Sequence, residues 1–440
     1  MKKAFVLLLT VICLLSFVGC VSEKKEEEVV FQKDVYTFDL SLEKNELICK
    51  IDLLHDVKAD GEQINFYSPA RDYVKIEVND REVEYEVKEG VLSLFSPFKT
   101  GRYNFAFEYV LPVEENAAPF GKAGNVYYAI AFYPQAYEGE ILPFAYEKPS
   151  LTLTPFDFSA QIKLPKNMFT LSSGKVISDE KGENERIVKI EGENVRDMTF
   201  TSSAAFVNRS QGKTRYYFVS DKDQKNTLKK CEERVEVFDE LFGEYFDELY
   251  VVKGAFPYSY ASDNMVLIKD DGDNDFDDEL TRTVSGEWWG QVVAANGKIP
   301  FLQDGLRGFS TLLFYLKSGD GKKFNALKKE LENVLEKRVI AGKDNALGKT
   351  TYEFGEDYGA VFDLGTLAFF ELYSLYGADF LDGLKRFAKE NADEIVYMED
   401  LYSAFDNKSE YTVFLSAWLD GKVVHALKAH TSQKVSVEAV

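Results

Sequence analysis

The sequence predicts an α+β multidomain protein in which an N-terminal antiparallel β-sandwich is followed by a mostly helical domain. Between residues 35 and 207, short runs of alternating apolar and polar residues, such as 73–78 and 103–109, are separated by turn residues, a pattern typical of strands in a sandwich. From about residue 222 the period changes, and Leu228, Val235 and Phe238 fall on one helical face.

The first twenty residues have the order of a lipoprotein signal. Lys2 and Lys3 precede an apolar run over 4–17, and Gly19 is followed by Cys20. A lipoprotein signal peptidase needs small residues at the cleavage point and a Cys directly after it. We therefore expect cleavage after residue 19 and a lipid on Cys20, which would anchor the chain to an extracytoplasmic membrane face. The alternatives are an ordinary signal peptide and an uncleaved membrane helix, for which the apolar run is short.

The mature chain is expected to begin with a charged tether over 20–34 and to end in a short tail over 431–440. No later segment is apolar enough to cross a membrane, so the rest is expected to be a soluble body. Removing Lys2 and Lys3 with the signal takes the formal net charge from −22 to −24, which disfavours nucleic acid as a partner. Cys49 in an expected strand and Cys231 in an expected helix are predicted to be buried thiols without a disulfide.

Several elements are expected in the second domain, which we place at 208–430. Strands are predicted over 248–252 and 264–268, and helices over 280–293, 305–316, 322–341, 364–376 and 378–390. The acidic run 270–279 does not have the register of a calcium loop, because Phe276 stands where the turn glycine belongs and Arg282 where the bidentate glutamate belongs. We expect a solvated loop there.

Four motifs in the same order resemble those of the aminopeptidase N group of zinc metallopeptidases, a gluzincin family, and the resemblance spans residues 35–420. Residues 194–200 with 203–206 resemble the last strand of the family's β domain, and residues 242–246 resemble the element before the first strand of its catalytic domain. Residues 260–264 stand at the place of the family's Gly-x-Met-Glu-Asn substrate strand, and residues 287–293 resemble the end of its zinc helix. The resemblance implies a thermolysin-like second domain and a cleft between the domains.

The family's zinc motif, His-Glu-x-x-His, is replaced in this chain by residues 282–286, Arg-Thr-Val-Ser-Gly. Arg282 and Gly286 stand where the resemblance implies two imidazole ligands, and Thr283 stands at the general base. A cation and a missing side chain cannot bind zinc, and a threonine hydroxyl does not accept a proton near neutral pH. The chain has only three histidines, His55, His425 and His430, and none precedes a glutamate. We therefore expect no zinc and no other cofactor.

Three further family positions are altered. Asp304 matches the third zinc ligand but is shorter than Glu and one residue closer, and Phe362 replaces the tyrosine that stabilises the tetrahedral intermediate. Asp263 stands for the glutamate that grips the substrate's amine, and with Asn264 it is the candidate for contacting a ligand in the cleft.

Arg282 is expected to replace the metal as a cation. It lies four residues before Gly286, so both face the same side of a helix, and we expect it to pair with Asp304 and with Asp263. The alternative is that Arg282 turns outward and Asp304 is hydrated. Trp288 and Trp289 are expected to pack between the domains.

These expectations favour a lipoprotein with a peptidase-like body that binds a peptide or a protein and does not act as an enzyme at the family's site. Two alternatives stay open. One is a hydrolase with residual activity or a different site, although no Ser-His-Asp or Cys-His arrangement is evident near residues 282–286. The other is a capture lipoprotein that serves a transporter, which the anchor and tether would suit.

Overall fold

The structure is a computed structural model that describes residues 31–136, 154–270, 276–296, 299–343, 346–349, 359–406 and 408–422. The chain divides into two units, Met1–Gln32 and Lys33–Val440. Cys20, most of the predicted tether, the central part of the acidic run, His425, His430 and the tail lie outside the described residues. No helix among the described residues has both the length and the apolar character needed to cross a membrane.

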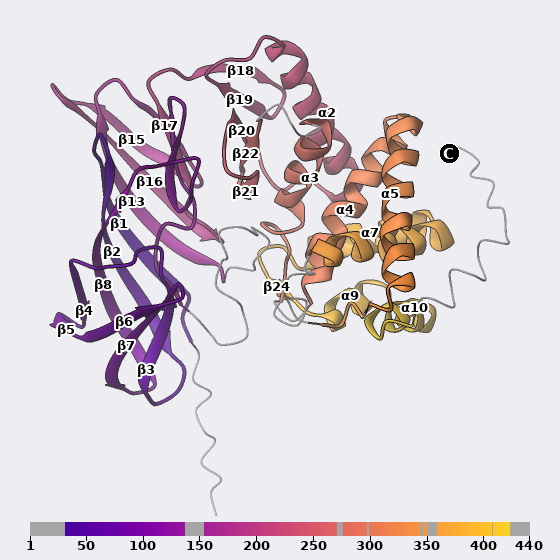
Figure 1. The fold of residues 1–440 in the computed structure, drawn as a ribbon, viewed down its shortest axis with the longest axis horizontal. Helices are drawn as coiled ribbons and strands as arrows, with labels where there is room; N and C mark the ends of the chain where they lie inside the picture. The colour runs from indigo at the N-terminus through magenta and orange to yellow at the C-terminus, as the bar shows by residue number, and fades with distance from the viewer. Residues whose placement is uncertain are drawn as a thin grey trace, which may run out of the picture. The chain divides into compact units, whose positions relative to one another are not determined.

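The N-terminal part of the second unit is built from strands (Figure 1). Its largest sheet has eight strands in the order β15-β16-β13-β1-β2-β8-β4-β5, and the sheet β12-β3-β7-β6 carries four. The strands of these two sheets are β1 (Asp34–Leu42), β2 (Glu46–Val57), β3 (Gly61–Tyr67), β4 (Lys75–Val78), β5 (Arg81–Glu82), β6 (Glu84–Lys88), β7 (Val91–Phe98), β8 (Gly101–Pro112), β12 (Gln135–Ala136), β13 (Phe156–Pro165), β15 (Lys175–Lys181) and β16 (Glu185–Val195).

A third sheet, of five strands in the order β14-β17-β11-β10-β9, belongs to the same part. It contains β9 (Glu114–Glu115), β10 (Phe120–Ala123), β11 (Val126–Ala129), β14 (Phe169–Ser172) and β17 (Phe200–Ser203). Alternating burial along β2 and β16 shows that each strand buries one face. The aromatic rings of Phe66 on β3 and Phe105 on β8 meet at 5.1 Å, so two sheets share one core, and the predicted sandwich is confirmed.

The strand pairing departs from the purely antiparallel pattern that the sequence predicts. β1 pairs with β13 in parallel over eight residue pairs, from Asp34 opposite Phe156 to Ser41 opposite Lys163. A parallel pair needs a long connection, and here the connection includes the rest of the strands from β2 to β12. Period-2 alternation fixes which face of a strand is buried but not the direction of its neighbour, so this pairing was not readable from the pattern.

The C-terminal part begins with a five-stranded mixed sheet and continues mostly as helices (Figure 1). The sheet order is β18-β19-β20-β22-β21, with β18 (Val207–Gln211), β19 (Thr214–Phe218), β20 (Leu249–Gly254), β21 (Tyr260–Ser262) and β22 (Met265–Lys269), and a small parallel pair joins β23 (Ala294–Ala295) to β24 (Ile395–Val396). The helices are α2 (Gln224–Phe242), α3 (Phe276–Trp288), α4 (Pro300–Lys317), α5 (Gly321–Ile340), α7 (Gly359–Tyr376), α8 (Ala378–Glu390), α9 (Met398–Ala404) and α10 (Ser409–Leu419). The predicted α+β class is confirmed.

Trp288 and Trp289 pack inside the helical part rather than between the two parts as expected. Trp288 is fully buried against Phe238 and Phe246, and its indole nitrogen donates to the carbonyl of Gly243 at 2.8 Å. Trp289 packs on Phe242. Both buried cysteines, Cys49 and Cys231, are free thiols, as the sequence predicts.

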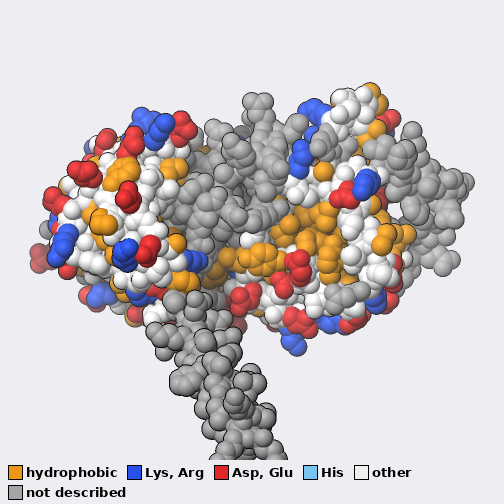
Figure 2. Space-filling view, turned by 90° about the horizontal axis from the view of Figure 1, so that it is seen from below, with side chains coloured by type: hydrophobic (Ala, Val, Ile, Leu, Met, Phe, Trp, Pro, Cys, Tyr) orange, Lys and Arg blue, Asp and Glu red, His pale blue; other side chains and the backbone are white. Residues whose placement is uncertain are grey.

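The surface carries charges of both signs. Figure 2 shows acidic and basic side chains intermixed on the face seen from below, and apolar side chains gathered over the helical part of that face. The excess of Asp and Glu over Lys and Arg is therefore not concentrated in one acidic region of this face.

Helices α4 and α7 cross in direct backbone contact. A Cβ atom added to Gly305 would lie 2.7 Å from the carbonyl carbon of Gly365 and 2.8 Å from its Cα atom. A Cβ added to Gly365 would in turn lie 2.9 Å from the Cα of Gly305. The two glycines therefore set the separation between the helix that carries Asp304 and the helix that carries Phe362.

We predict that Gly305→Ala lowers the free energy of unfolding by about 1–3 kcal/mol, because backbone atoms cannot yield to the new methyl group. The loss should exceed the gain of about 1 kcal/mol in helix propensity. Gly359→Ala at the start of α7 is the matched control, since a Cβ there meets nothing within 4 Å. Urea unfolding followed by circular dichroism measures both. Equal stability of the two variants would contradict the backbone contact.

Candidate functional site

Helix α3 carries Arg282, Thr283 and Gly286, the three residues that the family resemblance is expected to place at the zinc motif. Its first turn contains Asp277, Asp278 and Glu279, which suit the positive end of the helix dipole. The Thr283 side chain is 2 % exposed, and its hydroxyl donates to the carbonyl oxygen of Glu279 at 2.7 Å. That hydroxyl is therefore used within the helix.

The expected ion pair between Arg282 and Asp304 is wrong. The Arg282 guanidinium lies over the ring of Phe362, with its carbon 4.3 Å from the ring centre, and no described carboxylate is within ion-pair distance of it. An aromatic face attracts a guanidinium, and Phe362 on α7 presents its face to Arg282. The cost of an unpaired buried charge favoured Asp304 as the partner, but it does not reveal a ring that another helix brings to Arg282.

Asp304 is paired instead by Arg307, one turn further along α4. The Asp304 Oδ1 lies 3.8 Å from the Arg307 Nη1, and the Asp304 and Arg307 side chains are only 7 % and 12 % exposed. The i,i+3 spacing puts both side chains on the same face of the helix. Arg307 is thus the cation that the buried carboxylate requires.

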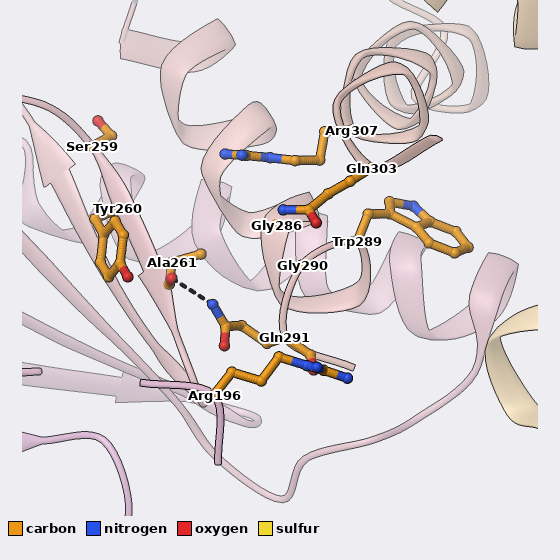
Figure 3. Close-up of a pocket in the computed structure, with 10 residues that line it drawn as sticks. All are labelled: Arg196, Ser259, Tyr260, Ala261, Gly286, Trp289, Gly290, Gln291, Gln303 and Arg307. Carbon is orange, nitrogen blue, oxygen red and sulfur yellow. Dashed lines mark hydrogen bonds between the residues drawn. The ribbon is translucent and has the colours of Figure 1, made fainter. Parts of the chain in front are cut away.

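The guanidinium of Arg307 lies directly against Gly286 (Figure 3). A Cβ atom at Gly286 would be 3.3 Å from the Arg307 Nε, 3.4 Å from its Nη2 and 3.0 Å from the Cβ of Ala261 on β21. A histidine ring at position 286 would overlap the guanidinium. The lack of a side chain at Gly286 therefore makes the space that Arg307 fills.

These residues do not fit a zinc ion. Zinc takes neutral imidazole, thiolate or carboxylate donors, but the position between α3 and α4 holds a fixed cation, and the Asp304 carboxylate lies 3.8 Å from that cation. Among the described residues, no three His, Cys, Asp or Glu side chains converge as a metal site would require.

A small cavity of about 20 Å³ lies beside Arg307. Its lining comes from Arg196, Ser259, Tyr260, Ala261, Gly286, Trp289, Gly290, Gln291, Gln303 and Arg307. In Figure 3, Arg307 and Gln303 extend from α4 toward Gly286 and β21, and the Gln291 amide donates to the Ala261 carbonyl at 2.7 Å. A volume of this size holds about one water molecule or one small polar group.

The two cleft candidates from the sequence, Asp263 and Asn264, form the turn between β21 and β22 and do not line this cavity. The Asp263 Oδ2 accepts the backbone N–H groups of Arg196 at 2.8 Å and Asp197 at 3.3 Å. Asn264 has a φ of 59°, a left-handed conformation that Asn tolerates, and its N–H donates to the Glu287 Oε2 at 2.9 Å. Two carboxylates therefore hold this turn in place: that of Asp263 within the turn and that of Glu287 on α3.

Arg196 is the second buried cation of the site. Arg196 directly follows β16 in the chain and is 2 % exposed. Its Nε donates to the Gln291 carbonyl at 2.7 Å and its Nη2 to the Glu394 carbonyl at 2.8 Å. Burial lowers the pKa of Arg196 to about 10, which leaves it charged at neutral pH. It connects the end of the β-rich part to two segments of the helical part, one at Gln291 and one at Glu394.

Two acids of the site have raised pKa values. Burial raises the pKa of Asp263 to about 7, against the opposing effect of its two backbone hydrogen bonds. Burial, with the nearby charge of Asp263, raises the pKa of Glu287 well above its usual value. Glu287 is 1 % exposed, and its Oε1 has no hydrogen-bond partner among the described residues. Both groups therefore favour their neutral forms relative to the unfolded chain.

Sequence reasoning missed Arg307, Arg196, Gln303 and the role of Glu287. One signal for Arg307 was available, because Asp304 and Arg307 have the i,i+3 spacing of a helical ion pair. Arg196 offered none, since its partners are backbone carbonyls 95 and 198 residues further along the chain.

The comparisons support the architecture. The sequence matches no protein-family model, and no curated protein shows significant similarity to it. Solved structures do match: a point mutant of an M1 zinc metallopeptidase from Deinococcus radiodurans superposes with a TM-score of 0.65 at 15 % identity, covering 89 % of this chain and 94 % of that one. The same mutant bound to a Tyr-Ser-Ala substrate gives a TM-score of 0.64 with equal identity and coverage. This chain thus has the fold of an M1 peptidase.

We predict that Asp263→Asn changes how stability depends on pH. With a folded pKa of about 7, above its usual 3.8, Asp263 stays protonated in the folded chain over a range where the unfolded chain has lost that proton. Wild-type stability should therefore fall as pH rises from about 4 to about 7. The Asn variant keeps an acceptor for both N–H groups and cannot ionise, so its stability relative to wild type should rise over that range by at least about 1 kcal/mol.

Asp179→Asn serves as the control of opposite sign, because the Arg186 guanidinium lowers the pKa of Asp179. Its stability relative to wild type should fall as the pH rises through the acidic range up to about 4 and stay level above about 5.5. Urea midpoints at pH 3, 4, 5.5, 7 and 8 give both curves, and parallel pH profiles for Asp263→Asn and wild type would rule out a raised Asp263 pKa.

Proposed function

We propose that this chain is an extracytoplasmic lipoprotein, anchored by a lipid on Cys20, whose peptidase-like body binds a peptide or protein segment without hydrolysing it at α3. The contact of the Arg307 guanidinium with Gly286 carries the proposal. It sets a permanent positive charge beside the helix position at which the family resemblance implies a metal ligand.

The remaining groups at α3 and α7 support a role without hydrolysis. Zinc peptidases require a metal-held water, a base to take its proton and a donor for the developing oxyanion. The Thr283 hydroxyl is bonded to the Glu279 carbonyl, and Phe362 has no hydroxyl to donate and lies under Arg282. The site therefore offers positive charge and amides, which suit binding.

The likeness in fold supports a peptide or protein as the ligand. One of the similar structures holds a Tyr-Ser-Ala substrate, so a body of this architecture can bind a short peptide. Here the cavity beside β21 is lined by polar residues from two parts of the chain, including Arg196 from the β-rich part and Arg307 from α4. The anchor rests on the sequence of residues 1–20.

We predict that purified protein contains less than about 0.1 zinc per chain and does not release a fluorophore from a panel of aminoacyl-coumarin amides, because the donors that zinc needs are missing. Elemental analysis and fluorescence measure the two, with a zinc aminopeptidase as positive control and a chelator arm. Stoichiometric zinc together with chelator-sensitive turnover would refute the proposal. Turnover that resists the chelator would instead favour a hydrolase with a different site.

We predict that Cys20→Ser moves the protein from the membrane fraction to the soluble fraction of the producing cells, because only the thiol can take the lipid. Cys13→Ser is the matched control, since residue 13 lies within the apolar run of the signal. Fractionation with immunoblotting measures the distribution. Equal membrane retention of wild type and Cys20→Ser would contradict lipid anchoring at this residue.

A further inference from the structure

Two arginines from distant segments line the cavity beside β21. Arg196 and Arg307 both line it, together with the amide side chains of Gln291 and Gln303 (Figure 3). Arg282 lies one helical turn from Gly286, stacked on Phe362, with no described carboxylate within ion-pair distance. The two arginines in the lining therefore come from α4 and from the end of β16, and Arg282 on α3 lies outside it.

The acids near the cavity are not among the described residues that line it. Asp304 is the described carboxylate that pairs with Arg307, at 3.8 Å. Glu287 and Asp263 are held by backbone N–H groups, and burial raises the pKa of both, so they give up negative charge more readily than exposed acids do. Arginine keeps its proton throughout the range of neutral pH. The described lining of the cavity thus includes two arginines and no acid.

We propose that this cavity recognises a carboxylate group of a bound peptide, from an acidic side chain or from a free C-terminus. The inference rests on the proposed function and names its ligand class. A guanidinium binds a carboxylate through two parallel hydrogen bonds, a geometry that a neutral amide cannot match. The cavity would thus bind an anionic group at the position where a zinc peptidase holds a cation.

The size and lining of the cavity suit one such group. About 20 Å³ accommodates a small polar head and not a large side chain. Gln303 is 6 % exposed and lines the cavity, and the N–H groups of its side-chain amide are donors from which a carboxylate can accept. The acidic chain as a whole, with a net charge of −22, repels anions at long range, so recognition depends on contacts inside the cavity.

Four pentapeptides, all acetylated at the N-terminus, test the proposal by isothermal titration calorimetry. They are titrated into the full mature chain at 0.15 M salt, where long-range repulsion is screened beyond about 8 Å. Two are amidated at the C-terminus and carry Glu or Gln at the centre of four alanines. The other two are all alanine, one with a free C-terminal carboxylate and one amidated. Each pair differs by one charge, so the first pair reports a side-chain carboxylate and the second a terminal one.

The variant that tests the site is Arg307→Gln combined with Asp304→Asn, which removes the cation without leaving its buried carboxylate partner charged. The matched control is Arg215→Gln on β19, whose guanidinium pairs with Glu248 and does not line the cavity. Circular dichroism melts establish that each variant is folded before titration.

We expect at least one charged peptide to bind wild type and Arg215→Gln about tenfold or more tightly than its neutral partner, and the double variant to lose that preference. Equal binding of both members in both pairs would overturn the carboxylate inference and leave the proposed function standing. A preference that survives in the double variant would overturn its assignment to Arg307. Failure of all four peptides to bind wild type would count against the inference and against peptide binding itself.

Discussion

The packing of the Arg307 guanidinium against Gly286 is the constraint on which the site depends. A side chain at position 286 would crowd the guanidinium, the packing places a cation 3.8 Å from the Asp304 carboxylate, and it sets a charged group between α3 and α4. Burying a guanidinium is costly unless its hydrogen bonds and charge are compensated. The pair Asp304–Arg307 provides that compensation within a single helix. The result is a preformed, charged wall for the cavity beside β21.

Hydrogen bonds between buried side chains and backbone groups join the β-rich part to the helical part. Arg196 donates to the carbonyl groups of Gln291 and Glu394, and Asp263 accepts the N–H of Arg196 itself. Each of these contacts pairs a side chain with a backbone group, and such contacts are sensitive to small shifts of the chain. The turn at Asp263 and Asn264 is therefore fixed by its surroundings, which explains why these two residues point at the chain and not into the cavity.

The sequence was sufficient for the fold class and for most elements, because alternation along β2 and β16 and helical periodicity in α2 and α8 are local properties. It failed where two segments had to be placed against each other. The direction of β13 beside β1, the stacking of Arg282 on Phe362 and the carbonyl partners of Arg196 depend on positions far apart in the chain. Arg282 has the charge needed to pair with Asp304, but charge alone does not decide between Arg282 and Arg307.

The parallel pairing of β1 with β13 has a consequence for how the chain is made. A ribosome produces β1 first, and β2 can pair with it at once as an antiparallel neighbour. The other edge of β1 must wait for Phe156, which emerges roughly 6 to 24 s after Asp34 at about 5–20 residues per second. During that interval a row of unpaired backbone groups is open to other chains, which is a known route to aggregation. The open edge of β1 therefore needs protection from other chains until β13 has been synthesised.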